Sequence, residues 1–520
     1  MHALANLSEE GGYAVRHGTQ FVSTFPNHDG ENSSCDFSTC AFPTLFPFGV
    51  GGIEVNQKLA VPFMEHVQWC LQYHDQWFHL HNSFTFVTFG IQQHQEALTS
   101  AQLQMQHRDF KLDMNTLLAL QPKDFQKASV EEKANVAISN LVVWWLYKHL
   151  QATNACVMGT DQSHAITWSK IWSTTVQYGP PTLWITINPS DLHDPIAQVF
   201  AGKDINMDGF NELSGVSAAK CTENIARDPY VAVKFFHFMV QLIFWSLFGI
   251  NSSRQQTSST IGLFGEVVAY IGVIELQNHG TLHLHMLMWL KEAPPADEMW
   301  KLLKLESFQE QIQTFISKNI HAHIPGLTCE SLKTMECEGD LAYSWPPHPD
   351  DAEFESKFNN LAYHLVQSQQ IHTCKWCACL NWDYKTMTWR CKRQAPFPLS
   401  KTDVVNGSGG WSPKCDYEFV NNFIPVLLVY AHCNHDAKLL TNGDVTMKVV
   451  WYITKYATKH QQKCSNTSAL LAKGLAFHFS DEKHIHDIHQ CSQLLLFQSY
   501  HSINQHSEQL AAQVMSYLMG

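Results

Sequence analysis

The chain has 520 residues, of which 45% are hydrophobic and 12% aromatic, so it can bury a sizeable core and is not intrinsically disordered. Its formal net charge of −13 excludes a uniformly basic nucleic-acid binder and leaves only local basic patches for such a role. Fifteen unevenly spaced cysteines, with no N-terminal signal peptide, indicate an intracellular reducing compartment in which some thiolates bind metal.

The first half of the chain predicts helices followed by a strand. Residues 1–60 are rich in Gly, Ser, Asn and Pro and predict irregular structure, whereas apolar and aromatic spacing turns helical from 61 to about 150. The sequence TLWITIN, residues 182–188, predicts a strand that ends in an Asn-Pro turn. A further helix is expected over 229–250, where the apolar run is short for a membrane span and favours a buried core helix.

Residues 269–290, AYIGVIELQNHGTLHLHMLMWL, predict a β-hairpin, because two apolar runs flank a three-residue turn that ends in glycine. This turn sets Glu275 opposite His283. Since residues two apart on a strand share a face, His285 and Gln277 are expected on that face as well. Two imidazoles with a carboxylate or an amide oxygen suit a divalent-metal site, with Glu275 or Gln277 as the third ligand. With 30 histidines in the chain, a chance His-x-His pair is the alternative.

A Cys/His cluster follows, after residues 295–360, which we interpret as an insertion or linker. Cys374 and Cys377 have the knuckle spacing of a structural zinc site, which Cys391 and His372 can complete, with Cys379 as a rival ligand. Reduced thiols in a core are the alternative.

Basic residues adjoin this cluster. Arg390, Lys392 and Arg393 are candidates to contact DNA phosphate, although a solvated basic face explains them equally well. Beyond them, FIPVLLVYAHCN at 423–434 predicts a strand, and the end of the chain predicts an amphipathic helix.

The segment TMKVVWYITKYATKHQQK, residues 446–463, predicts a helix on which Tyr452 and Tyr456 lie one turn apart. Lys455 and Lys459 each follow a tyrosine by three residues. A nearby ammonium and metal-bound phosphate oxygens would favour the phenolate, turning a poor nucleophile into a useful one. An amphipathic helix that buries one tyrosine and exposes its lysines is the alternative.

These passages occur in a recognisable order: LWITINPSD, then the His-x-His hairpin, then Tyr-x-x-Lys on a helix. The order resembles that of the HUH endonucleases of rolling-circle replication, and more narrowly the Rep-like N-terminal region of fungal Helitron transposases. Three further passages, CAFPTLFPFGVGGI, QYHDQWFHLHNSFTFVTFGI and CNHDAKLLTNGD, extend the resemblance over nearly the whole sequence. Leu282 stands where the general HUH pattern has proline, and His279 where an arginine is usual.

The resemblance implies a metal-dependent single-stranded DNA endonuclease and strand transferase. His283, His285 and Glu275, with Gln277 as an alternative or additional ligand, would hold Mg²⁺ or Mn²⁺. Tyr456 or Tyr452 would form a 5′-phosphotyrosine, with the lysines steadying phosphate charge. The Cys/His cluster would hold structural Zn²⁺.

The implied partners are single-stranded DNA at transposon ends and a helicase acting in trans, with no membrane involved. The implied location is the nucleus, although no targeting signal is evident. Helitron proteins continue into a helicase, so we expect a truncated copy. A catalytically lapsed, zinc-stabilised DNA-binding remnant is therefore the alternative function, and a metal-dependent hydrolase using only the His-x-His pair is a weaker one.

The expected fold is α+β, an HUH/Rep-type central antiparallel sheet with packed helices and with helical and zinc-binding additions. The expected domains are an irregular segment (1–60), a helical region (61–175), the first half of the Rep-like core (176–294), the zinc-bearing insertion (295–410), the second half of the core (411–475) and a C-terminal helical segment (476–520).

Overall fold

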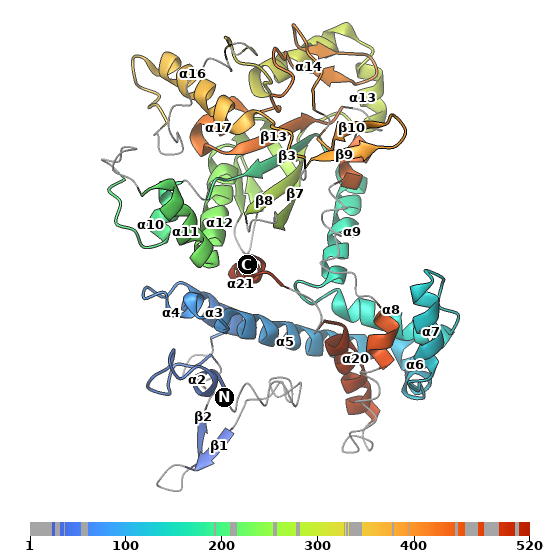
Figure 1. Cartoon of the computed structure of the whole chain (residues 1–520). Helices are drawn as coiled ribbons and strands as arrows, with labels where there is room; N and C mark the ends of the chain where they lie inside the picture. The colour runs from blue at the N-terminus through green and yellow to red at the C-terminus, as the bar shows by residue number, and fades with distance from the viewer. Residues whose placement is uncertain are drawn as a thin grey trace. The chain divides into compact units, whose positions relative to one another are not determined.

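The structure is a computed structural model of the chain (Figure 1). It describes residues 23–26, 32–35, 37–53, 61–191, 194–207, 216–252, 257–276, 281–326, 328, 331, 346–376, 379–393, 395–441, 446–452, 466–472, 488–504 and 509–520. The chain divides into two compact units, one formed by Met1–Ser169 with Ala457–Gly520 and the other by Lys170–Tyr456.

The first unit is helical, which confirms the expectation for residues 61–150. Its core is formed by apolar side chains such as Phe110, Leu146 and Leu495, which are almost completely buried. Its helices are α3 (Phe63–Leu71), α4 (Trp77–Leu80), α5 (Phe84–Gln106), α6 (Arg108–Leu118), α7 (Asp124–Lys133), α8 (Leu141–Asn154), α20 (Ile488–Asn504) and the predicted C-terminal helix α21 (Ala511–Met519). Its N-terminal part adds β1 (Ser23–Pro26), β2 (Asn32–Cys35) and α2 (Phe37–Ala41).

The second unit is built on a five-stranded sheet in the order β13–β3–β8–β7–β6, with every neighbouring pair antiparallel. The strands are β3 (Leu183–Asn188), β6 (Ile261–Gly262), β7 (Gly265–Leu276), β8 (Leu282–Leu290) and β13 (Asn434–Leu439). The predicted strand in TLWITIN is β3, and the predicted hairpin is β7–β8. Both predictions are confirmed, as is a mixed α and β fold with a central antiparallel sheet.

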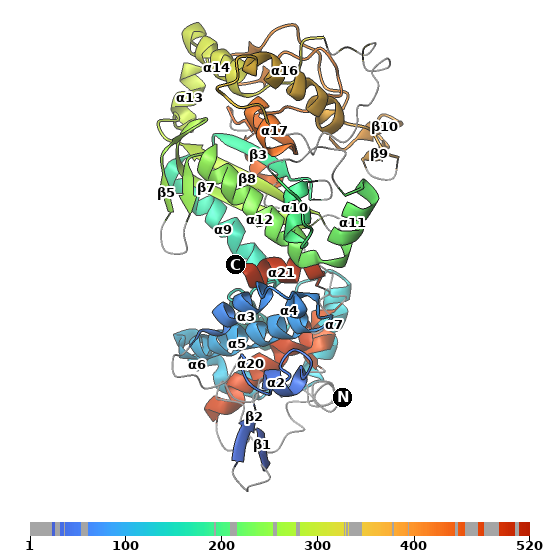
Figure 2. The ribbon, with the colours of Figure 1, turned by 90° about the vertical axis from the view of Figure 1, so that its left-hand side faces the viewer.

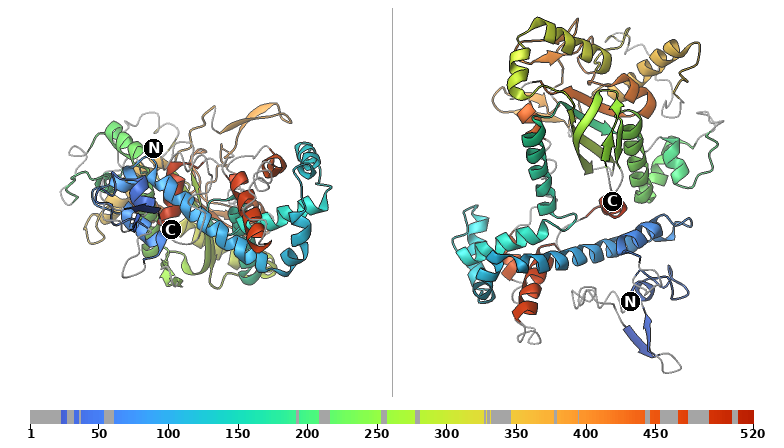
Figure 3. Two further views of the ribbon diagram at one scale, coloured as in Figure 1. Left: turned by 90° about the horizontal axis from the view of Figure 1, so that it is seen from below. Right: turned by 180° about the vertical axis from the view of Figure 1, so that it is seen from behind.

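Helices cover both faces of this sheet, and α9 (Asp161–Tyr178) and α12 (Pro229–Ser246) stand on opposite sides of it (Figures 1 and 3). On one face, Ile171 of α9 and Val450 of the helical residues 446–452 pack on Trp184 and Trp289. On the other, α12 begins at Pro229 and buries most of its apolar side chains, as the sequence predicts. None of the helices in the described part of the chain has the length and apolar character needed to cross a membrane.

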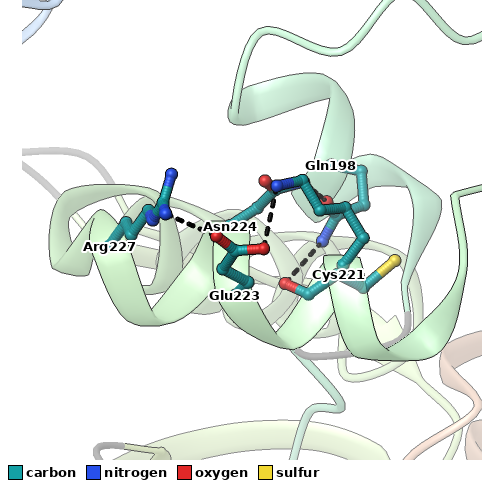
Figure 4. Close-up of polar contacts among 6 residues, drawn as sticks. Gln198, Cys221, Glu223, Asn224 and Arg227 are labelled. Atoms are coloured by element: carbon teal, nitrogen blue, oxygen red, sulfur yellow. Dashed lines mark hydrogen bonds and ion pairs between the residues drawn. The ribbon is translucent and has the colours of Figure 1, made fainter.

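The residues between α9 and β7 form further helices and a small hairpin, α10 (Pro195–Phe200), α11 (Ala218–Arg227), β4 (Ile250–Ser252) and β5 (Thr257–Ser259). A buried amide pair joins α10 to α11 (Figure 4). The Nδ2 of Asn224 donates to Oε1 of Gln198 at 2.9 Å, and Nε2 of Gln198 donates to the carbonyl of Cys221 at 3.5 Å. Gln198 is fully buried, so these bonds avoid the cost of leaving its amide unsatisfied.

Beyond β8 the unit continues with helices and short hairpins, which is more regular structure than a linker. They are α13 (Ala296–Leu302), α14 (Glu306–Asn319), α16 (Phe354–Leu365), the π-helical turn η4 (Val366–Gln370), β9 (Leu380–Asp383), β10 (Thr388–Cys391), β11 (Val404–Val405), β12 (Trp411–Ser412) and α17 (Pro425–Ala431). Figure 2 shows β9 and β10 at the edge of this unit, away from α9 and α12.

The predicted strand over 423–434 is wrong. These residues form helix α17, and the strand β13 begins only at Asn434. Pro425 occupies the first turn of the helix, where its missing N–H costs nothing. Leu427, Leu428 and Val429 are all buried, so the run carries no alternation by which a helix can be told from a buried strand.

Candidate active site

The His-x-His pair lies on β8, which is central in the sheet and hydrogen-bonded to β3 on one side and β7 on the other. Glu275 of β7 pairs directly with His283, which confirms the predicted register. Both His283 and His285 are about 6% exposed. Gln277 lies outside the described residues, so the choice between it and Glu275 stays a prediction.

His285 is held on both ring nitrogens. Its Nδ1 lies 3.1 Å from the hydroxyl of Thr186 on β3, and its Nε2 lies 3.1 Å from Oε2 of Glu275. Thr186 stands directly opposite His285 in the sheet. These two contacts fix the plane of the imidazole, and a partner on the second nitrogen is what orients metal-binding histidines generally.

His283 has a different environment. Its Nε2 is buried and has no hydrogen-bond partner among the described residues. Burial lowers the pKa of His283 to about 4, helped by the neighbouring His285 and by Arg393 and opposed by Glu275. The ring is therefore neutral near pH 7, and a neutral imidazole with an unpaired nitrogen is the form that binds a metal ion.

The donor set of His283, His285 and Glu275 fits a divalent cation. Adjacent ligands of an octahedral ion with bonds of about 2.1 Å lie about 3 Å apart, which matches the 3.1 Å between His285 Nε2 and Glu275 Oε2. Among the described residues, the group of potential ligands whose atoms all lie within 4.8 Å of one another is the Cys/His cluster described below. As a set, the ligand atoms of His283, His285 and Glu275 are therefore farther apart than this. One ion held by all three therefore requires a side chain to rotate.

Tyr452 comes from the helical residues 446–452 and lies on the same face of the sheet. Its ring meets the ring of His285 edge-on, with centroids 6.4 Å apart, and that of Trp184 at 5.5 Å. The side chain is 41% exposed. The structure therefore brings Tyr452 next to His285, while its approach to His283 and its role stay predictions. Tyr456, Lys455 and Lys459 lie outside the described residues.

Sequence reasoning missed the charged residues that β13 adds to this face. Asp436 pairs with Thr186, so it extends the row formed by Thr186 and His285. Lys438 lies 3.7 Å from Asp436 and places its ammonium 5.0 Å from the ring of Trp184. Burial raises the pKa of Asp436, against the opposing effects of Lys438 and Arg393. The alternation of apolar and polar residues in β13 indicates a strand. The sequence of that strand does not show that it pairs with β3.

The Cys/His cluster contains His372, Cys374, Cys379 and Cys391, whose ligand atoms all lie within 4.8 Å of one another. The His372 Nε2 is 3.2 Å from the sulfur of Cys391 and 3.4 Å from that of Cys374. Such spacing suits tetrahedral binding of a metal such as zinc, with zinc–sulfur bonds of about 2.3 Å. The rival ligand Cys379 is therefore in the group, whereas Cys377 lies outside the described residues.

The pKa shifts at the cluster differ between its members, because burial raises the pKa of Cys374 to about 11 while those of His372 and Cys391 are lowered. Burial and the charge of Arg393 lower the pKa of His372, so its imidazole is neutral near pH 7. Burial opposes ionisation of Cys391, but the backbone N–H groups of Arg393 and Ala395 bring its pKa below the ordinary value. A thiolate and a neutral imidazole are the forms that ligate zinc.

We expect the purified protein to carry zinc at this cluster and to lose it in Cys391→Ser, because serine cannot supply a thiolate. Metal analysis and thermal unfolding measure the outcome, and we expect the melting temperature to fall with the metal. Cys415→Ser is the matched control, since Cys415 is also buried but lies outside the cluster. Equal zinc content in Cys391→Ser and the unmutated protein would reject the site.

The three basic candidates occupy different environments. Arg390 forms an ion pair with Asp383 at 3.1 Å across the β9–β10 hairpin. Arg393 instead exerts its charge on His283, His372 and Asp436. Lys392 is exposed. Only Arg393 is thereby linked to both the His-x-His face and the Cys/His cluster.

Comparison with known families agrees with the resemblance found in the motifs. Residues 66–288 match the family described as the Helitron helicase-like domain at the N-terminus. The matched range contains Glu275, His283 and His285, and it ends before the tyrosine helix and the Cys/His cluster. No curated protein matches the chain significantly. Over residues 66–288 the chain is thus similar to the helicase-like N-terminal domain of Helitrons, which supports a Helitron-like transposase N-terminal region.

Proposed function

We propose that the second unit is a metal-dependent endonuclease and strand transferase that acts on single-stranded DNA, built on an HUH-type sheet. The observation that carries the proposal is the position of Tyr452, whose ring packs against the ring of His285 on the metal-binding face. A nucleophile must lie near the phosphate it attacks, and here a tyrosine and the candidate ligands share one surface.

In the proposed reaction, the phenolic oxygen of a tyrosine attacks the scissile phosphorus. The bond from phosphorus to the 3′ oxygen breaks, leaving a 5′-phosphotyrosine and a 3′ oxyanion that takes up a proton to become a 3′-hydroxyl, while the phenol's proton passes to solvent. A divalent cation held by His283, His285 and Glu275 would supply stabilisation of the charge that develops on the phosphate oxygens. Transfer back to a free 3′-hydroxyl reverses these bond changes and joins two strands.

Residues around the candidate ligands would orient His285, position Tyr452 and bind the phosphate. Thr186 and Glu275 hold the ring of His285 in one orientation. Trp184, which is buried, packs edge-on against the ring of Tyr452 and so limits where its hydroxyl can lie. Lys438, which lies between Asp436 and the ring of Trp184, would offer its ammonium to a bound phosphate on this face.

Incubation of the full chain with a labelled single-stranded oligonucleotide and Mn²⁺ tests the proposal. We expect a covalent protein–DNA adduct that survives denaturation, and none with a duplex of the same sequence. DNA binding without any adduct, in the presence of Mn²⁺ or Mg²⁺, would instead identify the chain as a zinc-stabilised DNA-binding remnant.

A further inference from the structure

Three tryptophans lie next to the Cys/His cluster, two on the β9–β10 hairpin and one just before it. Trp389 pairs directly with Trp382 across the two strands, with ring centroids 5.4 Å apart. Trp376 lies against Trp389 with centroids at 4.2 Å. Even so, Trp376 is 62% exposed and Trp389 is 44% exposed. Such a contiguous group of exposed aromatic rings marks a binding surface more often than a structural one.

The charged residues around these rings indicate which kind of ligand the surface binds. Residues 374–393 contain five basic residues and one acidic residue, in a chain whose net charge is −13. The acidic residue, Asp383, is already paired with Arg390. Lys375, Lys385 and Lys392 are exposed around the tryptophans. A surface with this composition suits an anionic ligand that also carries flat aromatic groups.

Unpaired nucleic acid bases combine these two properties. Single-strand binders stack bases on aromatic side chains and follow the backbone with basic ones. A duplex keeps its bases stacked on one another, so their faces are not accessible to Trp376 or Trp389. A protein partner would need many carboxylates to match the lysines and arginines, and it would not need flat groups to cover the rings.

Arg393 places a cation beside this surface, directly after the Cys/His cluster. Its backbone N–H donates to the sulfur of Cys391 at 3.4 Å, so the cluster fixes the chain from which its side chain extends. Its charge acts on His372 in the cluster and on His283 of the sheet. A strand that stacks on the hairpin is therefore next to the cation of Arg393.

We propose that the β9–β10 hairpin is a binding site for single-stranded DNA, with bases stacked on Trp376 and Trp389 and phosphates along Lys392 and Arg393. This binding site extends the proposed nuclease function, and the choice of DNA as the ligand rests on that function. A metal held by the Cys/His cluster would keep the hairpin in shape.

Fluorescence anisotropy of a labelled thymidine oligonucleotide, with the full zinc-loaded chain in a buffer lacking Mg²⁺ and Mn²⁺, tests this site without any cleavage. We expect Trp376→Ala and Trp389→Ala each to weaken binding at least about fivefold, since one stacked base contributes at least that much. Trp389→Phe should recover part of the loss. Arg393→Gln should lower affinity and reduce the salt dependence by about one counterion.

Trp300→Ala is the matched control, because Trp300 is 52% exposed in the same unit and has Lys304 at 5.1 Å from its ring. It should bind like the unmutated chain. Zinc content is measured for every variant. If Trp389→Ala loses zinc, the DNA affinities of Trp376→Ala and Trp389→Phe are used to judge the site instead. Unchanged affinity in zinc-loaded Trp376→Ala, or equal affinity for a duplex of the same length, would overturn the site.

The outcomes separate this site from the nuclease. An adduct formed by the unmutated chain, together with binding that ignores the tryptophans, removes the hairpin site and leaves the nuclease. Tryptophan-dependent binding of single strands without any adduct removes the nuclease and leaves the hairpin site. If the tryptophan variants lose DNA affinity fivefold but form the normal amount of adduct at saturating DNA, both the hairpin site and the nuclease are supported.

Discussion

Replacing His283 or His285 by alanine should reduce formation of the protein–DNA adduct by on the order of a hundredfold or more. Each change removes an imidazole from the set that would hold the cation, and with it several kcal/mol of charge stabilisation at the phosphate. Loss of His283 should leave the sheet folded, because its Nε2 has no hydrogen-bond partner among the described residues. The rate of adduct formation with Mn²⁺ is the quantity to measure.

His348→Ala provides the control for this prediction, since the side chain of His348 is 77% exposed in the same unit. It should react like the unmutated chain. Adduct formation at the normal rate in both His283→Ala and His285→Ala would show that the pair holds no catalytic cation. Loss of the adduct accompanied by a lowered melting temperature would point to a structural role for the two rings.

The second large effect concerns the tyrosines. Tyr452→Phe and Tyr456→Phe should each remove part of the two-step reaction, and the double change should remove all of it. Phenylalanine keeps the ring that packs on Trp184 and His285, so the fold should be unchanged and the loss isolates the hydroxyl. Gel analysis of denatured reactions measures cleavage and strand joining separately.

Tyr270→Phe is the matched control, because Tyr270 lies on the same sheet but packs against Phe244 of α12, with centroids 5.2 Å apart. It should leave both steps intact. A covalent adduct that persists in the Tyr452→Phe, Tyr456→Phe double variant would mean that another residue is the nucleophile.

The hairpin illustrates what local sequence can predict. The count of residues in the turn decides which residue stands opposite His283, and Glu275 does so because the count is odd. The strand β3 was also readable, from β-branched residues that end at an Asn-Pro turn. Helix α17 was not, because a short run of buried apolar residues has no period that separates a helix from a strand.

The rest of the site depends on the order of the strands. Thr186 and Asp436 join the histidines only because β3 lies between β8 and β13, and no short-range pattern specifies that order. The proximity of Tyr452 to His285 was expected from the resemblance to a family and not from spacing. The tryptophans of the β9–β10 hairpin are unevenly spaced along the chain, so only the pairing of Trp389 with Trp382 reveals them as one group.

The position of Tyr452 has a consequence for synthesis of the protein. His285 precedes Tyr452 by 167 residues and follows its sheet partner Thr186 by 99. At roughly 5–20 residues per second, the ribosome makes the histidine strand roughly 10 to 30 seconds before the tyrosine helix. A nascent chain can therefore assemble β3 with the strands β7 and β8 that carry the candidate ligands before Tyr452 has been made. The proposed ability to cut DNA would be acquired only when the last strand of the sheet and the helix after it have emerged.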